Sequence, residues 1–173
     1  MINWDALGAV GELLGAFVVL VTLGYLAIQT RSINKQSQAE ARYAFVEAMA
    51  QVNMVIAQST TTASIWRRGL ESIQELTEDE RMQFFMCLGQ YSNLWSVMHQ
   101  LHKDKLLPKE QWLVVRNDMV SILGSAGGRH FWKNGGEAAF DPGFSAFVNS
   151  ELKRSDRPYD MSAMTKGGNG TAA

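Results

Sequence analysis

Glu12 is the residue whose setting most clearly suggests chemistry, because it lies within an otherwise uncharged apolar segment. The segment spans residues 6–28, and Glu12 is the one charged residue among these 23. An acid inside a membrane is a candidate ion or proton site, or a partner for a cation on another protein. Two other interpretations stay open: Glu12 reaches headgroups or water, or it is protonated and hydrogen-bonded across an oligomer interface.

A stripe that includes three glycines and a threonine recurs along this segment at the spacing of one helix face. The members of this stripe follow one another at steps of three or four: Gly8, Gly11, Gly15, Val18, Thr22, Tyr25 and Gln29. Gly11 and Gly15 form a G-x-x-x-G pair, and small residues let two helices approach closely in lipid, where packing drives association. We therefore expect the three glycines and Thr22 to form a helix-packing face, which Glu12 flanks.

The remaining polar residues do not form a recognisable catalytic or metal-binding pattern. His99 and His102 are three apart on a predicted helix, as metal ligands can be, but no Cys or acid accompanies them at ligand spacing. A surface pair near the helix C-terminus, where the helix dipole favours positive charge, is the preferred interpretation. No serine has a triad context, and G-x-S-x-G is absent. We predict no catalytic residue, no metal and no cofactor, and hence not an enzyme.

The apolar segment has the length of a membrane span. A helix over residues 6–28 rises about 34 Å, against a hydrocarbon core of about 30 Å. Twelve of its residues are Leu, Ile, Val or Phe, and their summed contribution to insertion, roughly −5 kcal/mol, outweighs one acid near the end. A cleaved signal peptide is disfavoured, because no Lys or Arg precedes the segment and no A-x-A site follows it. A buried helix of a soluble protein is the remaining alternative.

Charge predicts the orientation of this span. All 16 Lys and Arg residues follow it, beginning with Arg31, Lys35 and Arg42. The positive-inside rule then places the C-terminal part in the cytoplasm and the short N-terminus outside. Trp4, Tyr25 and Arg31 are suited to the membrane interfaces.

Helical periodicity continues through most of the chain, and no strand pattern competes with it. Phe45, Met49, Val52 and Ile56 form an apolar face that extends the first helix to about residue 58. Later helices are expected at about residues 63–72, 77–103, 108–127, 129–133 and 142–152. Thr77 and Glu80 have the spacing of a capping box at the start of the second of these. Trp95 and Trp112 lie on the apolar stripes of neighbouring helices, so we expect one core to bury both.

The predicted fold is therefore all-α, with one N-terminal transmembrane helix continuing into a small cytoplasmic helical domain. We assign residues 1–30 to the anchor, 31–154 to the helical domain and 155–173 to a flexible tail. The formal net charge of −1 argues against nucleic-acid binding. The single cysteine, Cys87, excludes a disulfide within the chain.

Five blocks of the sequence resemble a large group of short, uncharacterised bacterial membrane proteins. They are residues 4–15, 22–31, 66–70, 127–132 and 144–148. The resemblance implies a bacterial inner-membrane protein with one N-terminal span, and it brings no activity with it.

Taken together, these features predict a membrane-anchored helical interaction or scaffold protein that self-associates through its span. Its expected partners are membrane lipid, further copies of itself and an unidentified membrane or cytoplasmic protein. The alternative is an oligomeric transport or channel component with a ring of Glu12 side chains within the membrane.

Overall fold

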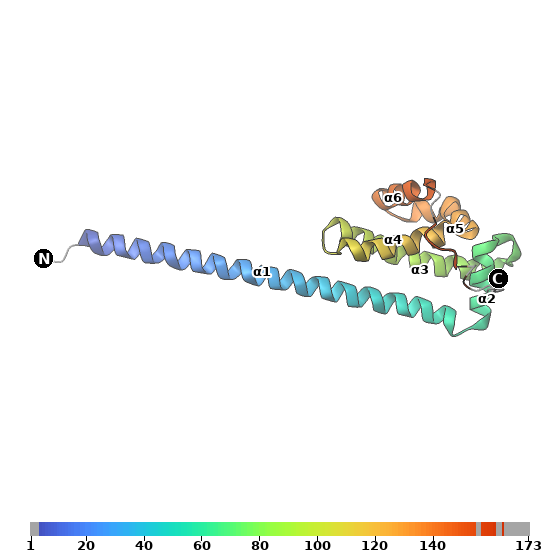
Figure 1. Cartoon of the computed structure of the whole chain (residues 1–173), viewed down its shortest axis with the longest axis horizontal. Helices are drawn as coiled ribbons and strands as arrows, with labels where there is room; N and C mark the ends of the chain where they lie inside the picture. Colours follow the sequence, from blue (N-terminus) through green and yellow to red (C-terminus); the bar gives the residue numbers. More distant parts are fainter. Residues whose placement is uncertain (1–3, 155–156, 162–163, 165–173) are drawn as a thin grey trace, which may run out of the picture. The chain divides into compact units, whose positions relative to one another are not determined.

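The computed structural model describes residues 4–154, 157–161 and 164, and only the backbone of residues 4–7, 9, 10 and 13. These residues form an all-α structure, as predicted (Figure 1). Its six α-helices are α1 (Trp4–Ala57), α2 (Thr60–Glu71), α3 (Glu78–Lys103), α4 (Lys109–Leu123), α5 (Ala126–Phe131) and α6 (Pro142–Lys153). Short helical turns follow α2 (Ile73–Glu75) and α5 (Trp132–Gly136 and Glu137–Ala139).

The chain divides into two compact units, Met1–Ala41 and Arg42–Ala173. The first unit holds the N-terminal part of α1. From Leu14 to Ile28 every side chain is exposed, including large apolar ones such as Phe17 and Leu20. Within the described residues, α1 is the one helix long and apolar enough to cross a membrane, with a mean hydropathy of 1.5 over its most apolar window.

The second unit begins with the last turns of α1, and these turns have one face packed on a core. Phe45, Met49, Val52 and Ile56 are half-buried against that core. Their steps of four, three and four residues place them on one side of a helix, so the amphipathic face predicted from the sequence is confirmed.

Side-chain caps define where the helices of the second unit begin. Ser59 accepts a hydrogen bond from the Thr62 amide at 3.2 Å and starts α2. Thr77 and Glu80 form the predicted reciprocal capping box of α3, with bonds of 3.3 and 2.9 Å. Asp141 accepts bonds from the first amides of α6. Each cap satisfies backbone donors that a helix leaves without partners.

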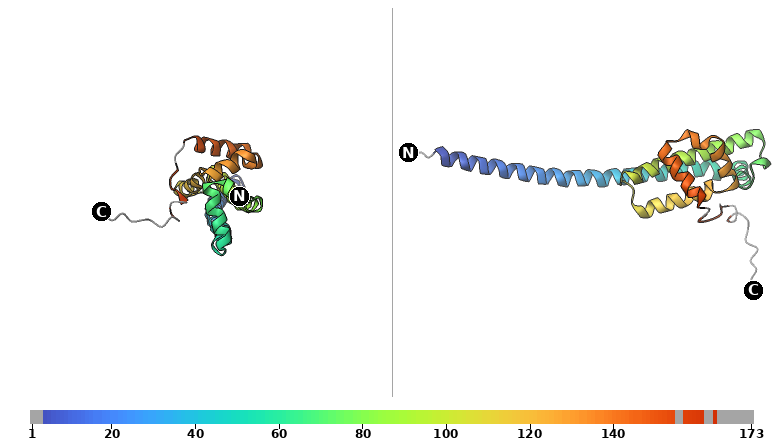
Figure 2. Two further views of the ribbon diagram at one scale, coloured as in Figure 1. Left: turned by 90° about the vertical axis from the view of Figure 1, so that its right-hand side faces the viewer. Right: turned by 90° about the horizontal axis from the view of Figure 1, so that it is seen from above.

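Helices α3 and α4 lie side by side and supply most of the core (Figures 1 and 2). Trp95 of α3 is fully buried, and Trp112 of α4 is 6% exposed. Phe144 and Val148 of α6 are also fully buried within the same cluster. One core therefore contains both tryptophans, as predicted.

The sequence placed the end of the fourth predicted helix at Gly127 and Gly128, and this is wrong. Helix α4 ends at Leu123, and both glycines lie inside α5. A Cβ on Gly127 would lie 1.8 Å from the carbonyl oxygen of Gly69, and one on Gly128 would lie 2.2 Å from that of Ile122. These positions hold glycine because α5 lies against backbone there.

Replacing Trp95 with alanine should lower the free energy of unfolding of the helical unit by about 3–5 kcal/mol, because it empties a large, fully enclosed site. Chemical or thermal unfolding followed by circular dichroism measures this loss. Val97→Ala is the matched control, since Val97 lies on the same helix and is 58% exposed. Equal midpoints for the two variants would contradict the assignment of Trp95 to the core.

Candidate functional site

The glycine stripe of the first unit has open space beside it. Gly8, Gly11 and Gly15 are exposed, and a Cβ built on any of them meets no atom within 4 Å. Their spacing places all three on one side of α1, within two turns. The single chain therefore leaves the backbone at these three glycines, here called the glycine furrow, uncovered.

The other predicted span residues all lie on α1, and none of those with described side chains is covered by the chain. Glu12, Tyr25 and Arg31 are exposed. The Thr22 hydroxyl donates a hydrogen bond of 2.8 Å to the Val18 carbonyl one turn earlier. Its polar group is thus satisfied within its own helix, which suits an apolar environment. Trp4 belongs to α1, but its side chain lies outside the described residues.

A separate polar cluster in the second unit centres on Asp118 of α4. One carboxylate oxygen accepts a hydrogen bond from the hydroxyl of Tyr159, and the other accepts one from Trp95 Nε1 at 3.1 Å. The Tyr159 amide also donates to the Ser121 hydroxyl at 3.3 Å. These bonds hold the segment 157–161 against α4.

Burial shifts the acidities in this cluster. Loss of water raises the pKa of Asp118, and the hydrogen bonds from Tyr159 and Trp95 oppose the rise because they favour the carboxylate. Burial, with the Asp118 hydrogen bond and charge, also raises the pKa of Tyr159. Burial first and the Asp118 charge second raise the pKa of Tyr91 to about 12. Tyr91 donates in turn to Asn53 Oδ1 at 2.5 Å, which links α3 to α1.

This cluster has the properties of a structural clamp. Both oxygens of Asp118 are already hydrogen-bonded, and Tyr159 keeps its proton at neutral pH. The hollow of about 520 Å³ beside the cluster has mainly apolar walls, including Phe45, Met49 and Val114. Sequence reasoning missed Asp118. The available signal was its position, three residues after Val115 and four before Ile122, on the apolar face of its helix.

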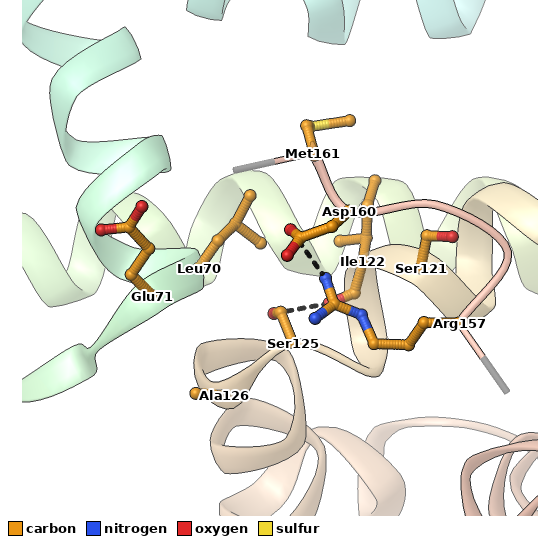
Figure 3. Close-up of a pocket in the computed structure, with 9 residues that line it drawn as sticks. All are labelled: Leu70, Glu71, Ser121, Ile122, Ser125, Ala126, Arg157, Asp160 and Met161. Atoms are coloured by element: carbon orange, nitrogen blue, oxygen red, sulfur yellow. Dashed lines mark hydrogen bonds and ion pairs between the residues drawn. The ribbon is translucent and has the colours of Figure 1, made fainter. Parts of the chain in front are cut away.

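A smaller pocket, of about 280 Å³, lies between α2, α4 and the segment 157–161 (Figure 3). Its Arg157 guanidinium pairs with Asp160 at 3.2 Å. The hydroxyls in it are engaged with backbone: Ser125 donates to the Ile122 carbonyl at 2.7 Å, and Ser121 accepts from the Tyr159 amide. No histidine is among the described residues that line this pocket.

The prediction of a surface histidine pair is wrong for His99. His99 is 9% exposed and stacks on Phe147, with ring centres 4.8 Å apart. His102 is half-buried and stacks on Trp112 at 5.2 Å. Burial lowers the pKa of His99. The C-terminal end of α3, where the helix dipole would favour a charged histidine, is covered by α6. The His99 ring is therefore packed in the core.

The described residues contain no group of three or more His, Cys, Asp or Glu side chains placed to hold a metal ion. Comparison with known proteins finds no matching family model, no similar curated protein and no similar solved structure. The resemblance to short bacterial membrane proteins therefore stays an expectation from the sequence.

The raised pKa of Asp118 predicts an unusual pH dependence of stability. The folded unit binds the Asp118 proton more tightly than the unfolded chain does. Protonation of Asp118 therefore contributes stability that is fully present below the unfolded pKa and is lost as pH rises through the folded pKa. Wild type should therefore gain stability relative to Asp118→Asn as pH falls from 7 to 4. Unfolding midpoints across that range measure the difference.

Tyr159→Phe provides the matched test of this mechanism. This substitution removes a hydrogen bond that favours the carboxylate, so it should raise the pKa of Asp118 further. The stability difference between Tyr159→Phe and the double variant with Asp118→Asn should then develop at higher pH than the corresponding difference in the wild-type background. A difference between wild type and Asp118→Asn that stays constant with pH would contradict the assigned shift.

Proposed function

We propose that this chain is a membrane-anchored helical interaction protein that self-associates through the apolar part of α1. The observation that carries the proposal is the furrow formed by Gly8, Gly11 and Gly15, where a Cβ would meet no atom of the chain. Lipid tails fill such a furrow poorly, whereas a second helix fills it with many close contacts, each about 0.1–0.2 kcal/mol.

The exposure of α1 supports the membrane part of the proposal. The core helix of a soluble protein is mostly buried, whereas the apolar window of α1 has no buried residue in the single chain. A signal sequence also has a window of this kind near the N-terminus. We infer a bacterial inner-membrane span, with the N-terminus outside and the helical domain that begins at residue 31 in the cytoplasm.

The surroundings of Thr22 favour an interaction protein over a transport component. A conducting path built around Glu12 needs further polar groups that face the same lumen. The Thr22 hydroxyl bonds to its own helix instead, and the stripe also contains Val18. The helical unit, held together by its aromatic core and the Asp118 clamp, is then the part that meets a cytoplasmic or membrane partner.

Gly15→Leu, or Gly11→Leu, should convert the detergent-solubilised oligomer to monomer, because the added side chain keeps the helices apart. Native mass measurement or cross-linking gives the size of the particle. Gly24→Leu is the matched control: Gly24 also has open space beside it but lies away from the stripe. A monomeric wild type, or an oligomer that survives both stripe substitutions, would refute self-association through this face.

Topology is tested separately with a C-terminal reporter. The 16 Lys and Arg residues that follow residue 28 predict a cytoplasmic C-terminus, so a cytoplasm-dependent reporter should be active and a periplasm-dependent one silent. Changing Arg31 and Lys35 together to Gln should weaken this preference. Activity of the periplasmic reporter alone would overturn the orientation.

A further inference from the structure

The stripe that carries the glycines does not stop at Gln29. The same steps of three and four residues continue along α1 through Ser32, Gln36, Ala39, Tyr43, Val46, Ala50 and Asn53. Asn53 already accepts a hydrogen bond from Tyr91 of α3, so the uncovered part of this stripe ends at Ala50. All of these residues are exposed, and Tyr43 and Val46 are 77% and 64% exposed. They are distinct from Phe45, Met49, Val52 and Ile56, which the second unit packs on its own core. Helix α1 therefore has a second face that the chain leaves uncovered.

Charges flank this second face in an ordered way. A seven-residue repeat with Gln36, Tyr43 and Ala50 at its first position, a, has Ala39 and Val46 at its fourth, d. The seventh position of the repeat, g, then holds Lys35 and Arg42, and the fifth, e, holds Glu40 and Glu47. In paired parallel helices, a residue at g lies beside the residue at e five positions later on the partner. Lys35 would face the partner's Glu40, and Arg42 the partner's Glu47.

The same charges disfavour the opposite arrangement. In an antiparallel pair, g lies beside g and e beside e, so cations would meet cations and acids would meet acids. Copies anchored by the same span all point the same way, and the pattern matches that constraint. Within the described part of the chain, Arg42 and Glu47 form no ion pair of their own, so each is available to a partner.

A groove beside this face would receive part of the partner. It has a volume of about 250 Å³ and lies within the second unit, between α1 and α4. Val46 of α1 and Val114 of α4 both line it, although they are 64% and 70% exposed. Arg42 lies at the same groove. The groove is apolar, and Arg42 at its edge can be neutralised by an acid of a second copy. Such a surface suits contact with another α1 better than contact with water.

We propose that residues 32–50 of α1 pair in parallel and in register with the same residues of a second copy of this chain. The contact uses Ala39, Tyr43, Val46 and Ala50 as its apolar seam. Lys35–Glu40 and Arg42–Glu47 are its ion pairs between copies. The inference rests on the proposed self-association and extends it from the membrane into the helical unit.

Cysteine cross-linking of the full-length protein in membranes tests the register. In a Cys87→Ala background, Val46→Cys should give disulfide-linked dimers under mild oxidation, because seam residues of a parallel pair face their own copies. Ala44→Cys is the matched control, since Ala44 is exposed on the same helix but lies off the seam. Failure of Val46→Cys to link, or equal linking of Ala44→Cys, would overturn the proposal.

Charge exchange tests the ion pairs. Arg42→Glu alone and Glu47→Arg alone should each reduce dimer formation several-fold by setting like charges against each other. Mixing the two variants should restore dimers that contain one of each, and the double variant should restore the homodimer. Lys109→Glu, an exposed change on α4, should have no effect. Thermal unfolding of each variant confirms that its helical unit is intact, and no recovery on mixing would overturn the pairing.

The span contact and the proposed seam can be distinguished by experiment. If Gly15→Leu dissociates the protein while the Val46 and charge variants behave like wild type, the span contact holds and the proposed seam is wrong. If Gly15→Leu leaves the oligomer intact and Val46→Cys still links, the seam holds and the span contact is wrong. A monomeric wild type refutes both.

Discussion

The exposed apolar surface of α1 is the constraint on which the rest of this protein depends. Between Leu14 and Ile28 the helix presents a nearly continuous set of large apolar side chains that the chain does not cover. Leaving such surface in water costs about 25 cal/mol per Å². A bilayer removes that cost without a fold around the helix. In the proposed assembly, the glycine furrow and the Glu12 side chain are the groups that this helix presents to a second helix.

The helical unit buries its apolar side chains in a core of its own, against which the last turns of α1 pack. Helices α3 and α4 enclose Trp95, and α6 closes the core with Phe144. Charged groups lock its outer layers: Arg116 of α4 pairs with the nearly buried Glu151 of α6, and Arg68 of α2 pairs with Glu80 of α3 at 2.5 Å. The Arg68 hydrogen bond lowers the pKa of Glu80, so that pair persists at neutral pH. Many polar groups of the unit therefore form hydrogen bonds or ion pairs that hold its helices together.

This use of the polar groups bears on function. The serines of the small pocket hydrogen-bond to backbone groups. One oxygen of Asp118 accepts from Tyr159 and the other accepts from Trp95, and the His99 ring stacks on Phe147. Groups used in this way are poor candidates for acid–base chemistry, because a reacting substrate would have to displace their existing partners. Among the surfaces that the described residues leave uncovered is the second face of α1 with its neighbour Val114.

Much of the fold followed from local patterns. The uninterrupted α1, the face from Phe45 to Ile56, the capping box of Thr77 and the shared burial of Trp95 and Trp112 were all predicted from the sequence. These features depend on helical period and on caps that act within four residues, so neighbours in sequence suffice to specify them. The candidate span residues were found in the same way, because apolar length and glycine spacing are linear properties.

Tertiary structure alone decided the contacts between distant segments. The sequence pattern at Gly127 and Gly128 is typical of a helix end. Both glycines lie inside α5 instead, where Gly127 approaches the backbone of α2 and Gly128 approaches that of α4. His99 is polar and near a helix end, yet the arrival of α6 buries it. Asp118 and Tyr159 are 41 residues apart, so no local pattern could pair them. The sequence determined which helices form and which faces are apolar, whereas only packing decided which backbone, ring or carboxylate each face would meet.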